Sequence, residues 1–163
     1  MTGRNAWLCK VASLPPEGRF RGYAVVNRAL EIGFAVTRLL RPSSFSYRGR
    51  RIRADAGDFL LTGDEGQLLG LRSAFGGDDV GVLKVGPGAI HGASLRPCVL
   101  ALYHDFGIFA ESLIDLAAAL RGLGFMRLIF LTSSTLGERL PGVDVLFLPA
   151  GDSTIIAQGL ELS

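Results

Sequence analysis

Residues 143–155, Val-Asp-Val-Leu-Phe-Leu-Pro-Ala-Gly-Asp-Ser-Thr-Ile, form the stretch of this sequence whose residue types are best suited to chemistry. An apolar run of strand length ends at Pro149, and Gly151 lets the backbone turn and approach a ligand closely. The next three residues, Asp-Ser-Thr, all have side chains that cap the first turn of a helix. Because a helix start presents free N–H groups and the positive end of a dipole, this turn suits an anion, a carboxylate or a developing oxyanion. The alternative interpretation is a capped turn that binds nothing.

Two other apolar runs also end in polar residues. Residues 98–103 run into His104 and Asp105, and residues 126–131 run into Thr-Ser-Ser. His104 and Asp105 are candidates for an acid/base pair or a ligand contact, although a histidine at a strand end is also often a hydrogen-bonded loop residue. The carboxyl ends of parallel strands meet at one edge of a sheet, so these groups are expected to line one cleft. The predicted site residues are His104, Asp105, Ala150, Gly151, Asp152 and Ser153.

The elements that position these residues can be read from the pattern of residues 97–163. Short apolar runs at 98–103, 126–131 and 143–148 indicate buried strands. Residues 109–120 place Phe and Leu at helical spacing, and a polar loop is expected over 132–141. The order strand, helix, strand, loop, strand predicts an α/β domain with an open parallel, flavodoxin-like, three-layer sheet, in which the helix crosses one face.

Residues 1–90 are expected to form a smaller α+β segment. Helical spacing predicts helices near 22–32 and 66–75, and a hairpin is predicted around Arg48-Gly49. The apolar piece 6–12 is expected to be an edge strand, because the Pro-Pro pair that follows cannot continue a central strand. Gly- and Pro-rich residues after 86 predict a linker over 91–96, which separates the two halves near Arg96.

Charge is distributed unevenly along the chain. Residues 1–60 hold 11 Lys/Arg against 4 Asp/Glu, a net +7, whereas residues 61–163 hold 6 against 11, a net −5. The sharpest basic cluster consists of Arg48, Arg50, Arg51 and Arg53, which suits nucleic acid or an acidic partner. No nucleic-acid-binding motif accompanies it, and arginines at alternate positions of a hairpin are more often a solvated face. The sequence therefore argues against a nucleic-acid partner.

Composition and motifs exclude several other classes. The longest apolar runs fall far short of the roughly 18 residues of a membrane span, and the first ten residues lack the apolar core of a signal peptide, so no membrane partner and a cytoplasmic location are expected. Cys9 and Cys98 are too few for a disulfide framework. The spacing of His91, Cys98 and His104 fits no common zinc pattern, and Gly86-Pro-Gly opens no helix as a dinucleotide fingerprint would. No metal and no cofactor are predicted.

Residues 97–163 resemble the first half of a class I glutamine amidotransferase-like domain, of the type found at the N-terminus of some biotin-protein ligases. The resemblance rests on the strand and exit loop at 99–107, on the Gly-Phe at 124–125, and on Asp-Val-Leu-Phe-Leu-Pro-Ala-Gly-Asp at 144–152. The family motif at the last of these is Asp-x-Leu-x-x-Pro-Gly-Gly-Asp. The resemblance implies that the backbone N–H groups of Ala150 and Gly151 belong to an oxyanion hole.

The sequence departs from the family at the groups that carry out catalysis. The family uses a Cys on a strand-to-helix elbow after this loop, with a His and an acid further downstream, and neither Cys9 nor Cys98 matches that elbow. Ala150 also replaces the first Gly of the Gly-Gly pair. The resemblance therefore implies an apparently truncated domain that binds a small anionic or carbonyl ligand or a partner protein, and that is not active alone. Two alternatives stay open. One is an amidase or transferase completed by a missing C-terminal part, and the other is a structural partner domain or oligomer that pairs through an exposed sheet edge.

Overall fold

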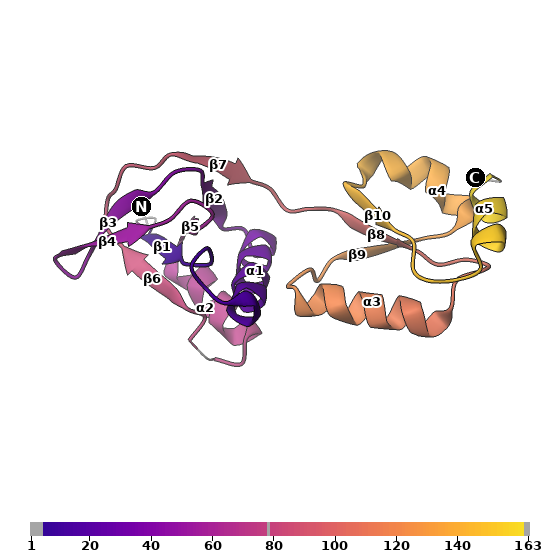
Figure 1. Cartoon of the computed structure of the whole chain (residues 1–163), viewed down its shortest axis with the longest axis horizontal. Coiled ribbons are helices and arrows are strands. Elements are labelled where there is room, and N and C mark those ends of the chain that lie inside the picture. Colours follow the sequence, from indigo (N-terminus) through magenta and orange to yellow (C-terminus); the bar gives the residue numbers. More distant parts are fainter. Residues whose placement is uncertain (1–4, 78, 162–163) are drawn as a thin grey trace. The chain divides into compact units, whose positions relative to one another are not determined.

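The chain divides into an N-terminal unit (Met1–Pro97) and a C-terminal unit (Cys98–Ser163). The structure, a computed structural model, describes residues 5–77 and 79–161 (Figure 1). The elements of the N-terminal unit are β1 (Asn5–Cys9), α1 (Pro16–Glu31), β2 (Ala35–Leu39), β3 (Ser43–Tyr47), β4 (Arg50–Ala54), β5 (Phe59–Gly63), α2 (Glu65–Ala74), β6 (Val82–Val85) and β7 (Gly92–Leu95).

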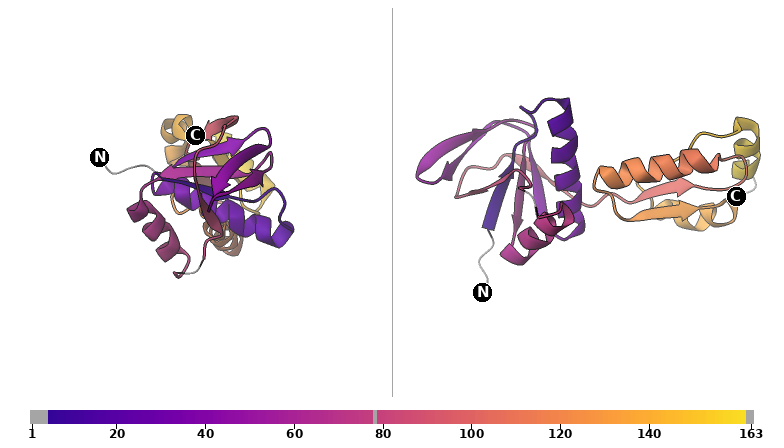
Figure 2. Two further views of the ribbon diagram at one scale, coloured as in Figure 1. Left: turned by 90° about the vertical axis from the view of Figure 1, so that its left-hand side faces the viewer. Right: turned by 90° about the horizontal axis from the view of Figure 1, so that it is seen from below.

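Five of these strands form an antiparallel sheet in the order β6-β1-β5-β2-β7. Successive side chains of a strand point to opposite faces, so the apolar strands of this sheet supply two cores. Trp7 and Cys9 pack with α1 and α2 on one face, where Figure 2 shows both helices. Leu8 packs on the other face with Phe45 and Ala54 of the β3-β4 hairpin. The sheet thus lies between two helices and a hairpin.

The predicted hairpin is confirmed. β3 and β4 pair antiparallel around Arg48 and Gly49, with Tyr47 opposite Arg50. Both turn residues have positive φ, 48° at Arg48 and 76° at Gly49, as a two-residue type I′ turn requires. This turn gives adjacent strands the twist of a regular hairpin, so the basic residues of β4 lie on an ordered ribbon.

Two predictions for the N-terminal half are wrong. β1 is not an edge strand, because it pairs with β5 on one side and β6 on the other, and the Pro-Pro pair lies beyond it at the start of α1. Residues 91–96 are not a simple linker, because β7 pairs with β2 and completes the sheet. The unit boundary accordingly follows Pro97. β7 is short and mostly polar, and the edge of β2 rather than its own composition makes it a strand.

The C-terminal unit contains β8 (Leu100–Tyr103), α3 (Ala110–Gly122), β9 (Leu128–Leu131), α4 (Ser133–Arg139), the 3-10 turn η1 (Leu140–Gly142), β10 (Val145–Phe147) and α5 (Ser153–Glu161). Its three strands pair in the order β10-β8-β9, and both pairings are parallel. The predicted parallel sheet over 98–148 is confirmed. All three strands therefore end at the same edge.

Two small cores hold this sheet. Leu100 and Leu102 of β8 pack with Ala117 and Leu120 of α3, while Ala101 between them packs with Leu136 of α4. Since neighbouring residues of a strand point to opposite faces, α3 and α4 cover opposite faces of β8, as Figure 1 also shows.

The prediction of a polar loop over 132–141 is wrong, since most of this segment is helix α4 followed by η1. Leu136 is the buried residue of that helix. One buried side chain in seven residues leaves no apolar period to detect. None of the helices in the described ranges carries an apolar stretch long enough to cross a bilayer.

Candidate functional site

Polar residues follow all three strands of the C-terminal unit, and two of these groups contain predicted site residues. His104 and Asp105 follow β8, Ser133 opens α4 directly after β9, and Gly151 lies between β10 and α5. The main-chain N–H of His104 donates to the carbonyl oxygen of Leu131, at 2.9 Å, which joins the ends of β8 and β9. Parallel pairing therefore places the three groups at one edge of the sheet.

Asp105 is the most connected side chain of this edge. Its Oδ2 accepts hydrogen bonds from the main-chain N–H and the hydroxyl of Ser133, at 2.8 and 2.6 Å, and its Oδ1 accepts from the N–H of Phe106 at 2.8 Å. These hydrogen bonds, first of all the one from the Ser133 hydroxyl, lower the pKa of the Asp105 carboxyl below its ordinary value of 3.8. Asp105 therefore acts as a clamp between the β8 exit loop and α4 rather than as a proton acceptor.

The clamp predicts an acid-sensitive C-terminal unit. Asp105→Asn should lower its free energy of unfolding by about 1 kcal/mol near neutral pH, because hydrogen bonds to a charged acceptor are lost. Since the folded-state pKa of Asp105 is lowered, the stabilisation is present above the ordinary pKa of 3.8 and disappears as pH falls through the folded value. Urea unfolding followed by NMR signals of β8 and β9 between pH 7 and pH 2.5 should show the two proteins converging in acid. Asp115→Asn, an exposed carboxylate on α3, should match the wild type throughout, and a constant difference down to pH 2.5 would contradict the clamp.

Residues 150–152 meet the β8 exit loop backbone to backbone. Gly151 and Ile108 form an antiparallel bridge, in which the N–H of Phe109 donates to the carbonyl of Ala150 at 3.0 Å and the N–H of Asp152 donates to the carbonyl of Gly107 at 2.7 Å. The contact is so close that a Cβ on Gly151 would lie 2.0 Å from the carbonyl oxygen of Gly107. Glycine is required here by the approach of another loop, not by the approach of a ligand.

This packing corrects the predicted pair of free N–H donors. The N–H of Ala150 already donates to the hydroxyl oxygen of Ser112 at 2.8 Å, so it is not available as an oxyanion-hole donor. The N–H of Gly151 makes no hydrogen bond among the described residues. Asp152 caps α5 as predicted, since its Oδ1 accepts from the N–H groups of Thr154 and Ile155 at 2.9 and 3.2 Å.

A cavity of about 480 Å³ opens beside the β8 exit loop. It is lined by His104, Asp105, Phe106, Gly107, Ile108, Ala110 and Leu113. The structure thus brings two of the six predicted site residues to the cavity. The other four, at 150–153, do not line it, although residues 150–152 are hydrogen-bonded or bridged to the loop that does.

His104 and the start of α3 provide the polar character of this cavity. The His104 ring packs edge-on against Phe130, with ring centroids 5.7 Å apart, and its imidazole nitrogens have no hydrogen-bond partner within the described residues. α3 begins without a side-chain cap, so the N–H groups of its first turn keep their capacity to donate. An imidazole beside the positive end of a helix suits a carboxylate or a carbonyl group.

Sequence reasoning missed several residues of this edge. Ser112 accepts a hydrogen bond from residue 150, and Phe130 packs against the His104 ring. Tyr103 is a fully buried side chain whose hydroxyl has no hydrogen-bond partner in the described ranges. Burial, and next the charge of Asp105, raise the pKa of Tyr103. A tyrosine that ends an apolar strand just before His-Asp was the one signal in the sequence for this group.

No described residues form a nucleophile with a base. Burial and the nearby Asp58 raise the pKa of the Cys9 thiol to about 12, and Cys98 packs against the core of the C-terminal unit. The hydroxyl of Ser133 donates directly to Asp105, with no imidazole between them. Over residues 5–77 and 79–161, no three His, Cys, Asp or Glu side chains gather closely enough to hold a metal ion.

Comparisons with known proteins assign no family to this geometry. Protein-family models, curated proteins and solved structures all give no match to the chain. The amidotransferase-like resemblance of residues 97–163 therefore stays a prediction from the sequence.

Proposed function

We propose that the C-terminal unit is an amidotransferase-like, three-layer flavodoxin-like domain that binds a small carboxylate or carbonyl compound and does not hydrolyse amides by itself. The observation that carries the proposal is the cavity of about 480 Å³ at the carboxyl edge of the parallel sheet, lined by the unpaired imidazole of His104. Ligands of open α/β sheets collect at this edge. A cytoplasmic location, inferred from the sequence, remains part of the proposal.

Each residue around the cavity has a separate part in the proposed binding. His104 donates a hydrogen bond to a ligand oxygen, and the first turn of α3 provides a favourable potential for its negative charge. Asp105 is a positioning residue, because both of its oxygens are already occupied by Ser133 and Phe106. The Phe106 side chain, 82% exposed, offers an apolar surface at the cavity rim.

The state of the Cys9 thiol supports the proposal that the chain does not turn over amides by itself. An amide hydrolase of this family would use a thiolate nucleophile, whereas the Cys9 thiol is buried in the N-terminal unit with its pKa raised to about 12. The enzyme alternative requires that a nucleophile and base come from a part outside residues 1–163. It keeps the same ligand site.

The test is titration of the whole chain with L-glutamate and L-glutamine, followed by amide NMR signals. Signals of His104, Phe106 and Ala110 should shift, and His104→Ala should weaken Kd about tenfold through loss of one hydrogen bond. His91→Ala, the same substitution in the N-terminal unit, should leave this Kd unchanged. The proposal fails if no carboxylate or amide shifts these signals, and conversion of glutamine to glutamate by the purified chain would show an active enzyme instead.

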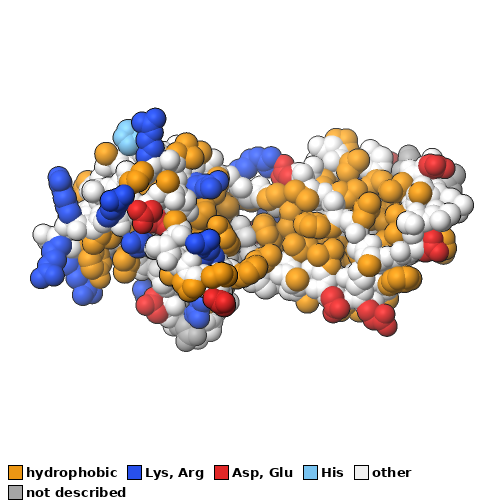
Figure 3. All heavy atoms as spheres, in the orientation of Figure 1, with side chains coloured by type: hydrophobic (Ala, Val, Ile, Leu, Met, Phe, Trp, Pro, Cys, Tyr) orange, Lys and Arg blue, Asp and Glu red, His pale blue; other side chains and the backbone are white. Residues whose placement is uncertain are grey.

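One observation favours a second candidate, a domain that docks a partner protein. Large apolar side chains are exposed on both outer strands of the three-stranded sheet, with Phe130 of β9 39% exposed and Val145 of β10 40% exposed. Figure 3 shows hydrophobic side chains gathered over this unit on the face in view. In the same NMR samples, concentration-dependent broadening confined to β9 and β10 would favour this candidate over ligand binding.

A further inference from the structure

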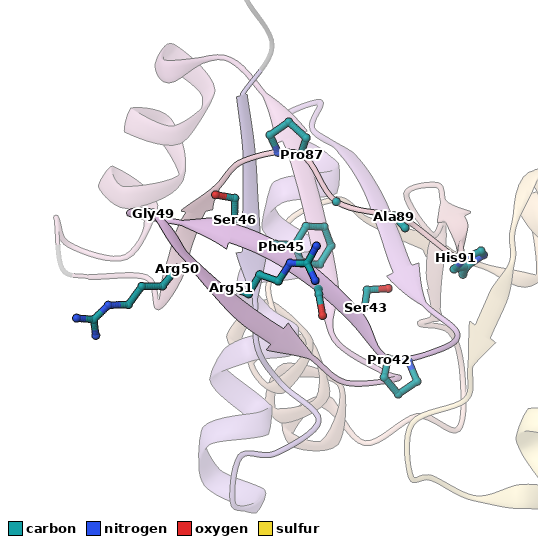
Figure 4. Close-up of a pocket in the computed structure, with 12 residues that line it drawn as sticks. Pro42, Ser43, Phe45, Ser46, Gly49, Arg50, Arg51, Pro87, Ala89 and His91 are labelled. Atoms are coloured by element: carbon teal, nitrogen blue, oxygen red, sulfur yellow. The ribbon is translucent and has the colours of Figure 1, made fainter.

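The N-terminal unit contains a second and larger cavity, of about 580 Å³ (Figure 4). Its lining comes from β3, from the turn and first residues of β4, and from the segment before β7: Pro42, Ser43, Ser44, Phe45, Ser46, Gly49, Arg50, Arg51, Pro87, Gly88, Ala89 and His91. A volume of this size lies within the roughly 300–1,000 Å³ of small-molecule sites. No carboxylate lines it.

The floor of this cavity is held on both sides. β3 pairs with β4 along one edge, and on its other edge the N–H of Gly86 donates to the carbonyl of Ser46 at 2.8 Å while Gly88 bridges Phe45. The approach is close enough that a Cβ on Gly88 would lie 2.5 Å from the carbonyl oxygen of Ser44. A ligand here would therefore meet a preformed surface.

Hydroxyl and guanidinium groups share the outer face of this hairpin. Ser46 lies directly opposite Arg51, and directly opposed residues of an antiparallel pair point to the same face. Ser44 and Ser46 are exposed, whereas Phe45 between them is buried in the core on the other side. In Figure 4 the Arg51 side chain reaches over β3, while Arg50 extends away from it.

Three of the four hairpin arginines, Arg48, Arg51 and Arg53, differ in the groups that contact them. Arg53 forms an ion pair with Asp55, at 3.3 Å, and the Arg48 guanidinium lies over the ring of Tyr47, 5.3 Å from its centroid. Arg51 has no ion pair or hydrogen bond within the described residues, and neither does the His91 side chain. The cavity therefore has a guanidinium and an imidazole in place and no negative charge to balance them.

We propose that this cavity binds the phosphate group of a small organic molecule, a site separate from the proposed carboxylate site of the C-terminal unit. The Arg51 guanidinium provides two parallel N–H donors for phosphate oxygens, and the hydroxyls of Ser44 and Ser46 with the His91 imidazole provide further donors. Pro42 and Pro87, on either side, offer apolar surface for the rest of the molecule. A nucleic acid would instead need a row of free cations along its backbone, and Arg48 and Arg53 are already engaged.

The experiment is titration of the whole chain with pyrophosphate and with inorganic phosphate, at low salt and at about 150 mM salt, by calorimetry and amide NMR. Signals of Ser44, Ser46 and Gly88 should shift. Arg51→Gln should weaken Kd at least tenfold and Arg51→Lys several-fold, because lysine keeps the charge but not the fork of donors. Arg53→Gln, on the same strand and face with the same change in charge, should stay within twofold of the wild type. Both positions are exposed, and unchanged signals of β1 and β5 will verify the fold.

Three results would overturn the proposal. One is equal weakening by Arg51→Gln and Arg53→Gln, which would mean a diffuse attraction to the basic hairpin. Another is the absence of shifts at Ser44, Ser46 and Gly88. The third is that a ten-nucleotide RNA binds more tightly than pyrophosphate and that Arg51→Gln and Arg53→Gln weaken this RNA binding equally. That result would make the hairpin a nucleic-acid surface. Because these signals belong to the N-terminal unit, the outcome is independent of the result for His104.

Discussion

Asp58→Ala is expected to lower the free energy of unfolding of the N-terminal unit by about 3 kcal/mol or more, since each unsatisfied buried donor costs about 1–3 kcal/mol. Asp58 is fully buried. Its Oδ1 accepts from the N–H groups of Val11 and Ala12, at 2.8 and 2.9 Å, and its Oδ2 accepts from the N–H of Asp55 at 2.9 Å. The side chain thus joins the segment after β1 to the turn before β5, and alanine would leave all three donors without a partner.

The measurement is urea unfolding followed by fluorescence of Trp7, the single tryptophan, which is buried in this unit. Asp55→Ala is the matched control, because that aspartate lies in the same turn and its side chain forms, within residues 5–77 and 79–161, a surface ion pair with Arg53 alone, worth about 0–1 kcal/mol. The free energy of unfolding of Asp58→Asn should fall between those of the two alanine variants. The asparagine amide keeps one acceptor oxygen, but its NH2 group would face a main-chain N–H, which is also a donor. If Asp58→Ala unfolds at the same urea concentration as the wild type, water hydrogen-bonds the three N–H groups as well as the carboxylate does.

Gly151→Ala is expected to destabilise the C-terminal unit by about 3 kcal/mol, at the upper end of what overpacking usually costs. The new Cβ would lie 2.0 Å from the carbonyl oxygen and 2.9 Å from the carbonyl carbon of Gly107, and 3.0 Å from the Cα of Ile108. All three are backbone atoms, so the clash can be relieved only by parting the loop and breaking the Ile108–Gly151 bridge. Gly107 and Ile108 line the cavity beside His104, so ligand binding should be lost as well.

Amide hydrogen exchange of β8 and β9 will measure this effect in the C-terminal unit alone. Gly122→Ala is the control, because a Cβ there meets nothing within 4 Å, and it should exchange as the wild type does or more slowly. Gly151→Val should speed this exchange more than Gly151→Ala does. If the amide hydrogens of β8 and β9 are as well protected from exchange in Gly151→Ala as in Gly122→Ala, the backbone at 151 does not pack closely against Gly107 and Ile108.

Elements with a clear apolar period were predictable. The strand-helix-strand pattern that became β8, α3 and β9 predicted parallel pairing, because a helix between two buried strands returns the chain in the same direction. Asp152 was predictable as a cap, because its partners lie two and three residues away. α4 was not predictable, since Leu136 is its buried residue and one apolar position in seven residues sets no period.

The sequence by itself determined which segments are strands or helices with a buried face, where the β3-β4 hairpin turns, and that polar groups follow buried strands, because these properties depend on residues a few positions apart. Tertiary structure alone decided which of those groups are free. The N–H of Ala150 is not free because it donates to the hydroxyl of Ser112, 38 residues away. Asp105 is a clamp because it accepts from Ser133, 28 residues away. In the hairpin, the cavity that Arg51 lines is completed by Pro87, Gly88 and His91, which come from a distant segment of the chain. Availability for chemistry depends on contacts between segments distant in the chain, and local pattern carries no information about those contacts.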